Sequence, residues 1–281
     1  MKCISCQAIL TKKISSLEID WQVFVCENCN LKQTDPEKTL DSEKAYEKSF
    51  WDHTQYKDYT GTDFSDKGVQ DLVKSWNSWF TYFKKYFSNK KSILDIGSGS
   101  GISLVMFENK GYDVTGIEPD SRNVKLINQR LKKGNCISGF FEDIKLEKKF
   151  EIIWSSHSFE HVKNPNSFLE KCSQLLADDG ILCIVVPDGD SPKMLSQSIK
   201  NINHLFHYSK KSLQILAKKH NFDIISCDSI ALMNRNLFRI NKILRKCQFT
   251  SVSSRFYPLY PFINTTKNNG EEIRIALKKK I

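Results

Sequence analysis

The fold of this 281-residue chain is decided by the stretch ILDIGSGSG, at Ile93–Gly101. A short apolar run that contains Asp95 leads into three glycines at alternate positions, Gly97, Gly99 and Gly101. Such a run is typical of a buried strand that ends in a tight turn into a helix. In open parallel sheets the ligand lies beyond the carboxyl ends of the strands, where glycines let the backbone approach it closely. The stretch therefore predicts a strand, a ligand-binding loop and a helix in succession.

Apolar runs and helical patterns alternate after this loop, which predicts an α/β fold. The expected sheet is doubly wound, mostly parallel and seven-stranded, with right-handed crossovers. Strands are expected at residues 92–96, 112–118, 135–139, 150–156, 181–187, 222–232 and 271–279, and helices at 101–111, 120–134, 165–176 and 209–221. Before the loop, aromatic residues recur at spacings of three and four, which favours an amphipathic core helix over an aromatic binding cage. These residues are Trp76, Trp79, Phe80, Phe83 and Phe87.

The spacing of the glycines limits which class of nucleotide-like ligand the loop can bind. A dinucleotide fingerprint reads GxGxxG, but Ile102 stands where the third glycine belongs when the count begins at Gly97. Glu118 follows Gly97 by 21 residues, at the end of the next expected strand. An acid there accepts hydrogen bonds from ribose hydroxyls, a role that sites for NAD and S-adenosylmethionine share. The alternative for Glu118 is a simple charge at the N-terminus of the next helix.

Four segments together carry a family resemblance: ILDIGSGSG at 93–101, VTGIEPD at 114–120, FFEDI at 140–144 and SHSFEHVKNP at 156–165. In order and spacing they resemble class I S-adenosylmethionine-dependent methyltransferases, over about residues 45–229. The chain is similar to small-molecule and sugar methyltransferases, some of which begin with a cysteine-ligated zinc unit. The resemblance implies a Rossmann-like fold, S-adenosyl-L-methionine as cofactor and methyl transfer as the reaction.

The resemblance also implies which residues hold the cofactor. The glycine loop lines the methionyl and ribose part, Glu118 holds the ribose hydroxyls, and Phe141 with Glu142 or Asp143 lies at the adenine. Relatives often have an acid where Phe140 stands, so the choice of carboxylate for the adenine amino group stays open. The implied cofactor-binding set is Asp95, Gly97, Ser98, Gly99, Gly101, Glu118, Pro119, Phe141, Glu142, Asp143 and Ser156.

Two histidines are candidates for catalysis. His157 lies in a segment that resembles the LEH signature of small-molecule methyltransferases, and it is expected to act as a base or a cofactor contact; Glu160 and His161 are expected to fix the loop. Related sugar C-methyltransferases carry a Glu-His pair where this chain has Asn203 and His204. Because an amide cannot act as a base, the pair favours methylation of oxygen over carbon. His204 is interpreted either as the general base for a hydroxyl or as a residue that fixes the loop.

The N-terminal segment contains two CxxC pairs, Cys3 with Cys6 and Cys26 with Cys29, with 19 residues between the pairs. This spacing predicts one closed, tetrahedral and therefore structural Zn²⁺ site. About 30 residues cannot build a stable core alone, and metal binding would supply the folding free energy. The alternatives are a redox-active dithiol pair or unliganded thiols. The other five cysteines are expected to be free thiols in apolar surroundings.

Three regions are expected along the chain. Residues 1–33 form a zinc ribbon-like unit, residues 34–90 a helical lead-in whose Trp51, Tyr56 and Tyr59 can form a lid, and residues 91–281 the methyltransferase domain. A basic C-terminal extension begins at about residue 230. Residues 199–281 hold 16 Lys or Arg against 4 Asp or Glu, a balance of +12 that leaves the first 198 residues at −2 of the total +10. This asymmetry favours an anionic partner, although a solvated lysine-rich surface is the plain alternative.

The predicted function is methylation of a small-molecule acceptor, in particular a phosphate- or nucleotide-linked sugar of surface-glycan or nucleotide-sugar metabolism, on oxygen. A nucleic-acid methyltransferase is the first alternative, but SSHS at 155–158 replaces the NPPY-like tetrad of that class. A non-catalytic scaffold that keeps the cofactor fold is the second. A basic stripe at 235–247 suits peripheral membrane contact or packing on its own domain. Since no apolar run nears the roughly 20 residues of a membrane span and no signal peptide is evident, a cytoplasmic location is expected.

Overall fold

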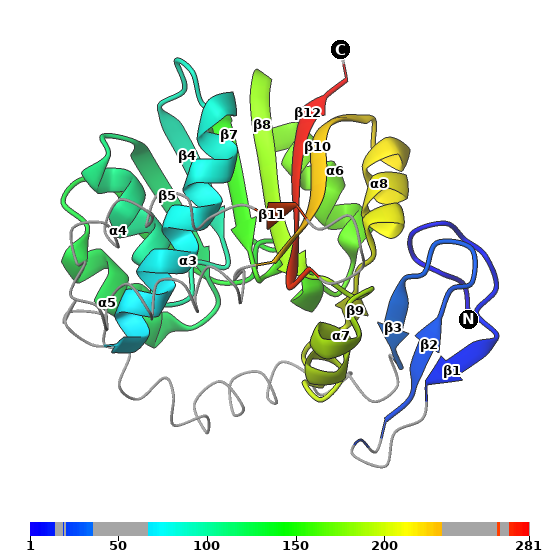
Figure 1. Cartoon of the computed structure of the whole chain (residues 1–281). Helices are drawn as coiled ribbons and strands as arrows, with labels where there is room; N and C mark the ends of the chain where they lie inside the picture. Colours follow the sequence, from blue (N-terminus) through cyan, green and yellow to red (C-terminus); the bar gives the residue numbers. More distant parts are fainter. Residues whose placement is uncertain (15–18, 20, 36–66, 232–262, 265–269, 281) are drawn as a thin grey trace, which may run out of the picture.

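The computed structural model describes residues 1–14, 19, 21–35, 67–231, 263–264 and 270–280 (Figure 1). Its main sheet has the order β11-β10-β12-β8-β7-β4-β5-β6. The five strands from β8 to β6 are parallel, and β12 runs antiparallel to both of its neighbours. The predicted seven-stranded, mostly parallel sheet is confirmed, and the two-residue β11 extends one edge. The strands are β4 Ser92–Ile96, β5 Asp113–Glu118, β6 Asn135–Ser138, β7 Phe150–Ser156, β8 Leu176–Pro187, β10 Phe222–Ala231, β11 Ile263–Asn264 and β12 Glu272–Lys279.

The order of the strands places the ligand site. From the central β4 the chain runs outward to β5 and β6, then crosses back to β7 and β8 on the other side of β4. The switch point is therefore between β4 and β7, where the connections leave in opposite directions. Ligands bind beyond the carboxyl ends of strands at such a point. The loops that begin at Gly97 and His157 follow these two strands.

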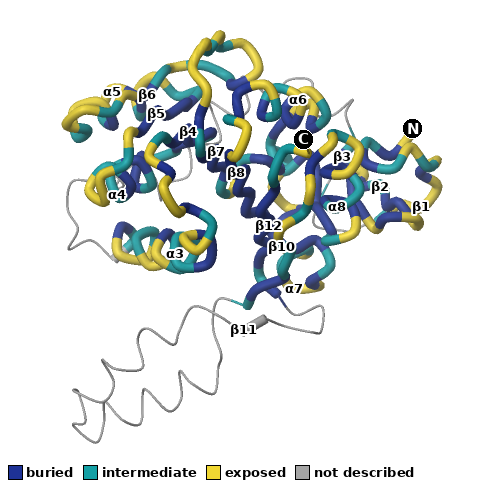
Figure 2. The backbone as a smooth tube through the Cα atoms, turned by 90° about the horizontal axis from the view of Figure 1, so that it is seen from above, coloured by how far each residue is buried: buried dark blue, intermediate teal, exposed yellow. Residues whose placement is uncertain are grey.

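Helices cover both faces of the sheet (Figures 1 and 2). The aromatic stripe predicted for the core belongs to α3: Trp76 is 1% exposed, Phe83 is fully buried, and Phe87 packs in the same cluster just beyond the helix. The core prediction is therefore confirmed for these three residues. The helices on one face are α3 Lys67–Phe83, α4 Ile102–Asn109 and α5 Ser121–Arg130, and those on the other are α6 Pro165–Leu175 and α8 Lys210–Lys219.

Some element boundaries differ from the sequence predictions. The helix expected to run to Gly134 ends at Arg130. Beyond it, the carboxylate of Glu108 accepts hydrogen bonds from the backbone N–H groups of residues 132–134, which holds them outside the helix. Strand β8 begins at Leu176, earlier than expected. The predicted cap of α8 is confirmed, since the Ser209 hydroxyl accepts from the backbone N–H of the third helical residue.

The cysteine-rich unit packs on the segment that follows β8. Its strands β1 Lys12–Ile14, β2 Val23–Val25 and β3 Lys32–Thr34 continue into β9 Phe206–His207 to form one antiparallel sheet (Figure 1). The helix α7, Pro192–Ser198, lies beside this junction. The sheet is continuous across the unit and the larger domain, so the unit is attached by backbone hydrogen bonds as well as by side chains.

Some predicted features lie outside the described residues. These are the aromatic lid with Trp51, Tyr56 and Tyr59, most of the basic C-terminal extension and the basic stripe at 235–247. Among the residues that the structure does describe, no helix is both long enough and apolar enough to cross a membrane.

Candidate active site

A cavity of about 690 Å³ opens at the switch point of the sheet. It is bounded by the glycine loop, the end of β5, the loop at 140–143, the turn after β7, part of α3 and the segment 201–205. Both predicted catalytic histidines, His157 and His204, line it. So do nine of the predicted cofactor residues: Gly97, Ser98, Gly99, Glu118, Pro119, Phe141, Glu142, Asp143 and Ser156.

The glycine loop leaves room for a ligand. Gly99 has φ of +54°, which favours glycine, and a Cβ added there would meet no atom within 4 Å. A Cβ at Gly97 would instead lie 2.3 Å from Oγ of Ser158. Gly97 therefore permits close packing of the loops that follow β4 and β7, while Gly99 presents bare backbone to the open cavity.

Two predicted cofactor residues do not line the cavity. A Cβ at Gly101 would lie 2.5 Å from Cγ1 of Ile127, so this glycine permits α5 to pack against the loop. The side chain of Asp95 is buried, with 1% of the residue exposed, and its Oδ2 accepts a hydrogen bond from the hydroxyl of Ser103. Burial raises the pKa of Asp95 to about 6. Asp95 thus acts on the cavity through Ser103, which does line it.

Glu118 supports the glycine loop directly. Its carboxylate is 1% exposed and accepts hydrogen bonds from the backbone N–H of Gly99 at 2.8 Å and of Asp120 at 3.1 Å. Burial, together with the negative charges of Asp120 and Asp95, outweighs these hydrogen bonds and raises the pKa of Glu118 to about 7. The bond to Asp120, at the cap of α5, agrees with the helix-terminal alternative, and the position at the cavity wall agrees with ribose binding.

His157 is held in a strained conformation between two carboxylates. Its φ of 51° lies in the left-handed region, which costs a residue with a side chain about 1–2 kcal/mol. Nδ1 lies 3.6 Å from Oε1 of Glu160, and Nε2 lies 3.4 Å from Oε2 of Glu272. Burial alone would lower the pKa of His157, but the two carboxylates outweigh it and raise the pKa to about 10. The geometry therefore favours a protonated hydrogen-bond donor over a base at this position.

The sequence prediction missed Glu272, which comes from the C-terminal strand β12. Besides contacting His157, it accepts hydrogen bonds from Nε1 of Trp79 at 2.8 Å and from Nε of Arg274 at 2.6 Å. Glu272 and Arg274 are both almost fully buried. One signal was present in the sequence: two opposite charges at alternate positions of an otherwise apolar strand, EIRIAL, imply a buried ion pair on one face.

Two further histidines that line the cavity, His161 and His204, lie close together. Nδ1 of His161 lies 2.8 Å from the carbonyl oxygen of Asn203, a contact that agrees with the predicted loop-fixing role. The ring of His204 packs edge-on against that of His161, with centroids 4.7 Å apart. Burial and the neighbouring His161 lower the pKa of His204 to about 4, so it is neutral at pH 7. A neutral imidazole is the form that can accept a proton.

Glu160 lies beside these two histidines as a buried anion. The residue is 1% exposed, and in the described part of the chain neither carboxylate oxygen accepts a hydrogen bond. Burial raises its pKa, but His157, His161 and His204 outweigh burial and lower the pKa to about 2. The carboxylate is therefore placed to stabilise positive charge on any of these rings.

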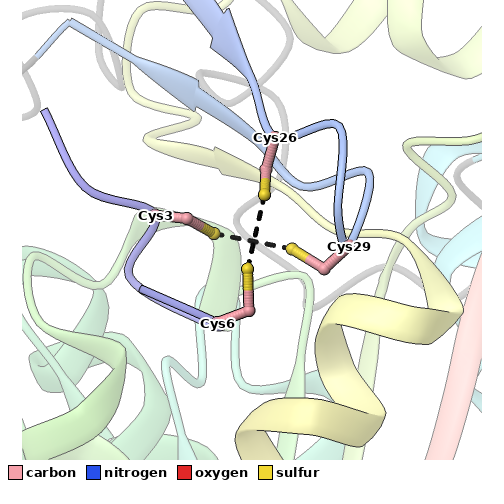
Figure 3. A group of neighbouring side chains, drawn as sticks. All are labelled: Cys3, Cys6, Cys26 and Cys29. Carbon is pink, nitrogen blue, oxygen red and sulfur yellow. Dashed lines mark hydrogen bonds between the residues drawn. The ribbon is translucent and has the colours of Figure 1, made fainter. Parts of the chain in front are cut away.

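Two groups of side chains bring metal-binding atoms together. The four sulfurs of the cysteine unit converge on one point (Figure 3), with 3.5 Å between the sulfurs of Cys3 and Cys29 and 3.4 Å between those of Cys6 and Cys26. All four lie within 4.8 Å of one another. In the cavity, a second group with the same limit comprises Glu160, His161 and His204. Imidazole and carboxylate are also donor types that divalent cations accept.

Comparison with known families and curated proteins gives consistent matches. Residues 55–227 match the family model described as "Methyltransferase domain". An uncharacterized methyltransferase of Staphylococcus carnosus is 31% identical over 119 residues, 42% of this chain and 57% of the relative. A ubiquinone biosynthesis O-methyltransferase of Glaesserella parasuis is 32% identical over 105 residues, 34% of this chain and 44% of the relative. The matched part therefore spans about half the length of these relatives.

Solved structures share the fold. The plantazolicin methyltransferase BpumL, in complex with SAH and a desmethylPZN analogue, has a TM-score of 0.56 and 16% identity, covering 87% of this chain and 98% of that one. A methyltransferase of Thermotoga maritima, titled a possible histamine N-methyltransferase, has a TM-score of 0.56 and 16% identity, covering 77% and 96%. Because the family model covers more than half of the sequence, this chain belongs to the methyltransferase-domain family.

Proposed function

We propose that this enzyme methylates a hydroxyl of a small or glycan-linked acceptor, with His204 as general base. The observation that carries the proposal is the neutral His204 imidazole at the far end of the cavity, beside the buried carboxylate of Glu160. The O-methyltransferase named among the relatives supports oxygen as the methylated atom. The partner of His204 in related C-methylating enzymes is absent, because position 203 is Asn.

The cofactor end of the cavity fits S-adenosylmethionine. The open space at Gly99 would admit the methionyl and ribose part, and the buried carboxylate of Glu118 would accept hydrogen bonds from the ribose hydroxyls. Phe141 offers an apolar surface to the adenine, with Glu142 or Asp143 at its amino group. Ser98, Pro119 and Ser156 complete the wall. When bound, the sulfonium supplies an electrophilic methyl group, so the protein mainly has to align the acceptor.

The acceptor end supplies acid–base chemistry. His204 takes the proton of the attacking hydroxyl, and the Glu160 carboxylate stabilises the imidazolium that forms. His157 is held protonated between Glu160 and Glu272, so both of its N–H groups face carboxylates and the ring contributes positive charge to the cavity wall. Asn201 and Asn203 line the same end and offer amide groups for the hydroxyls of a sugar.

The cysteine unit is proposed to hold one structural Zn²⁺. A tetrahedral thiolate site with Zn–S bonds of about 2.3 Å separates the sulfurs by about 3.8 Å, close to the distances between Cys3 and Cys29 and between Cys6 and Cys26. Burial of three of the four cysteines leaves no open position for a substrate. The metal would fix the fold of residues 1–33, a ribbon-like unit that borders the acceptor end through β9.

The proposed acceptor class is a phosphate- or nucleotide-linked sugar. The excess of 16 Lys or Arg over 4 Asp or Glu in residues 199–281 supports an anionic partner, and Lys163 adds a cation to the cavity wall. The absence of disulfides among the cysteines of the described residues suits a reducing compartment such as the cytoplasm.

Two measurements test the proposal. Calorimetry with S-adenosylhomocysteine should show binding that Gly99→Arg abolishes, because the new side chain fills the open space beside that residue. Failure of the parent protein to bind would overturn the cofactor assignment. Labelled methyl transfer to a panel of nucleotide-sugars and to RNA then tests the acceptor: we expect transfer to a sugar that His204→Gln lowers, and transfer to RNA alone would contradict the acceptor class.

A further inference from the structure

A closed chain of hydrogen bonds begins and ends at His204. The hydroxyl of Thr34 donates to the carbonyl oxygen of His204 at 2.8 Å. The same hydroxyl oxygen lies 3.4 Å from Nε2 of His207. On the other side, Oγ of Ser198 lies 2.7 Å from Nδ1 of His207 and 2.7 Å from Nδ1 of His204. Each separation is within hydrogen-bonding range, so what each atom can donate or accept decides where the hydrogens lie.

Both imidazoles in this series of hydrogen bonds, those of His204 and His207, are neutral. His207 is 2% exposed, and burial, with the neighbouring His204 and Lys32, lowers its pKa to about 3. His204 is neutral for the same principal reason. A neutral imidazole carries one N–H donor and one acceptor nitrogen. Each ring therefore has two tautomers, and the neighbours choose between them.

The carbonyl of His204 determines which atom donates and which accepts in every hydrogen bond of this series. The carbonyl oxygen only accepts and lies 2.8 Å from the Thr34 hydroxyl, against 3.4 Å for Nε2 of His207, so the single hydroxyl hydrogen of Thr34 points to the carbonyl. The Thr34 oxygen can then only accept from His207, so His207 carries its hydrogen on Nε2 and accepts on Nδ1. The hydrogen of Ser198 consequently points to His207, and its oxygen accepts from Nδ1–H of His204. Nε2 of His204 is left as the acceptor nitrogen.

The opposite order of hydrogens is disfavoured at one contact. A proton on Nδ1 of His207 would leave two lone pairs facing each other between that ring and Thr34. Ser198 would then donate to His204, whose proton would move to Nε2 and remove the basic nitrogen. The choice between a basic and a non-basic His204 thus depends on one hydroxyl group in the cysteine unit.

We propose that Thr34, His207 and Ser198 are positioning residues that hold His204 in the tautomer whose Nε2 lone pair serves as the base. The inference rests on the proposed role of His204. Thr34 ends β3, and its backbone N–H donates to the carbonyl of Leu205 at 3.0 Å, so pairing of β3 with β9 delivers the hydroxyl to its place. The cysteine unit therefore contributes to the chemistry of the active site without lining the cavity.

The test is proton–nitrogen NMR of the ¹⁵N-histidine-labelled, full-length protein saturated with S-adenosylhomocysteine. Long-range correlations distinguish Nδ1–H from Nε2–H imidazoles, and His204→Gln assigns the signals. We expect the Nδ1–H tautomer of His204 in the parent protein and in Thr34→Ser, which keeps the hydroxyl. Thr34→Val keeps the shape but loses the hydroxyl, and should shift the tautomer ratio about fivefold, the equivalent of one neutral hydrogen bond. An Nε2–H tautomer in the parent would overturn the inference.

A second set of variants tests whether the effect of Thr34 on the His204 tautomer passes through Ser198. Ser198→Ala breaks the chain, so adding Thr34→Val should no longer change the ratio at His204. An equal change in both backgrounds would overturn the inference, because the effect would then bypass Ser198. Thermal melting and zinc content verify that each variant is folded. Loss of S-adenosylhomocysteine binding by the parent would contradict the proposed function itself, whereas intact binding with the wrong tautomer would contradict only this inference.

Discussion

His157 and Glu118 show how single residues in the cavity are held in states that water would not favour. His157 adopts a left-handed backbone conformation, and the carboxylates of Glu160 and Glu272 compensate its cost by fixing the ring from both sides. Glu118 is buried beside Asp95, so its ionised form is disfavoured until a ligand supplies hydrogen-bond donors. Such perturbed groups are typical of functional sites, and here both line one cavity.

The burial of Glu118 predicts a pH-dependent affinity for the cofactor product. Because burial raises the pKa of Glu118 to about 7, the carboxylate becomes protonated as the pH falls through 7 and loses capacity to accept the ribose hydroxyls. We expect the affinity for S-adenosylhomocysteine to fall as the pH is lowered from about 8 to 6.5, measured by calorimetry. Glu118→Gln should bind about 30-fold or more weakly, the loss of roughly 2 kcal/mol of charge-assisted hydrogen bonding, and should show little of this dependence.

A matched control for that prediction is Glu147→Gln, since Glu147 is exposed and does not line the cavity. It should leave both the affinity and its pH dependence unchanged. An equally steep pH dependence in Glu118→Gln would show that another group, such as Asp95, is responsible.

At the scale of elements, the cysteine unit is small but is joined to the domain at several points. The buried Lys32 forms an ion pair with the partly exposed Asp190 at 3.0 Å and also donates to the carbonyl of Gly189 at 2.7 Å. The hydroxyl of Ser209, which caps α8, donates to the carbonyl of Cys29 at 2.6 Å. The first turn of α8 is therefore bonded to a cysteine knuckle, and the order of the unit and that of α8 depend on each other.

Metal analysis of the purified protein should find about one zinc per chain. Cys26→Ser should lose the metal and unfold at a markedly lower temperature, because metal binding supplies most of the folding free energy of so small a unit. Cys227→Ser is the matched control, as Cys227 is only partly buried and lies outside the cluster, and it should keep the zinc. Unchanged stability of a metal-free preparation would rule out the structural zinc, and a second equivalent would indicate that Glu160, His161 and His204 also bind a cation.

For the molecule as a whole, strand β12 connects helix α3 with His157 at the active site. Strand β12 lies between β8 and β10 and carries Glu272 and Arg274 on the face covered by α3. Arg274 donates to the backbone oxygen of Ser78 at 3.0 Å, and Trp79 donates to Glu272. Helix α3, strand β12 and His157 thus share one polar network, in which Glu272 and Arg274 are buried.

This network predicts a large destabilisation by a nearly isosteric change. Glu272→Gln leaves Arg274, which is fully buried, without its compensating charge, and should lower the free energy of unfolding by about 3–5 kcal/mol. Chemical denaturation followed by tryptophan fluorescence measures the loss. The double variant Glu272→Gln with Arg274→Met should recover much of it, because the unpaired charge is gone. A double variant as unstable as the sum of both single variants would mean that packing, and not charge, controls this region.

Short-range spacing and periodicity are enough to predict the parallel core, the glycine loop, the acid at Glu118 and the two CxxC pairs. Which distant side chains share the cavity depends instead on the tertiary structure. His157 and Glu272 are 115 positions apart, and Thr34 and His204 are 170 apart. It also showed that Asp95 and Gly101 support the loop from behind. Contacts of this kind depend on the pairing of β12 with β8 and of β3 with β9, which no local pattern specifies because the partner strands lie far apart in the chain.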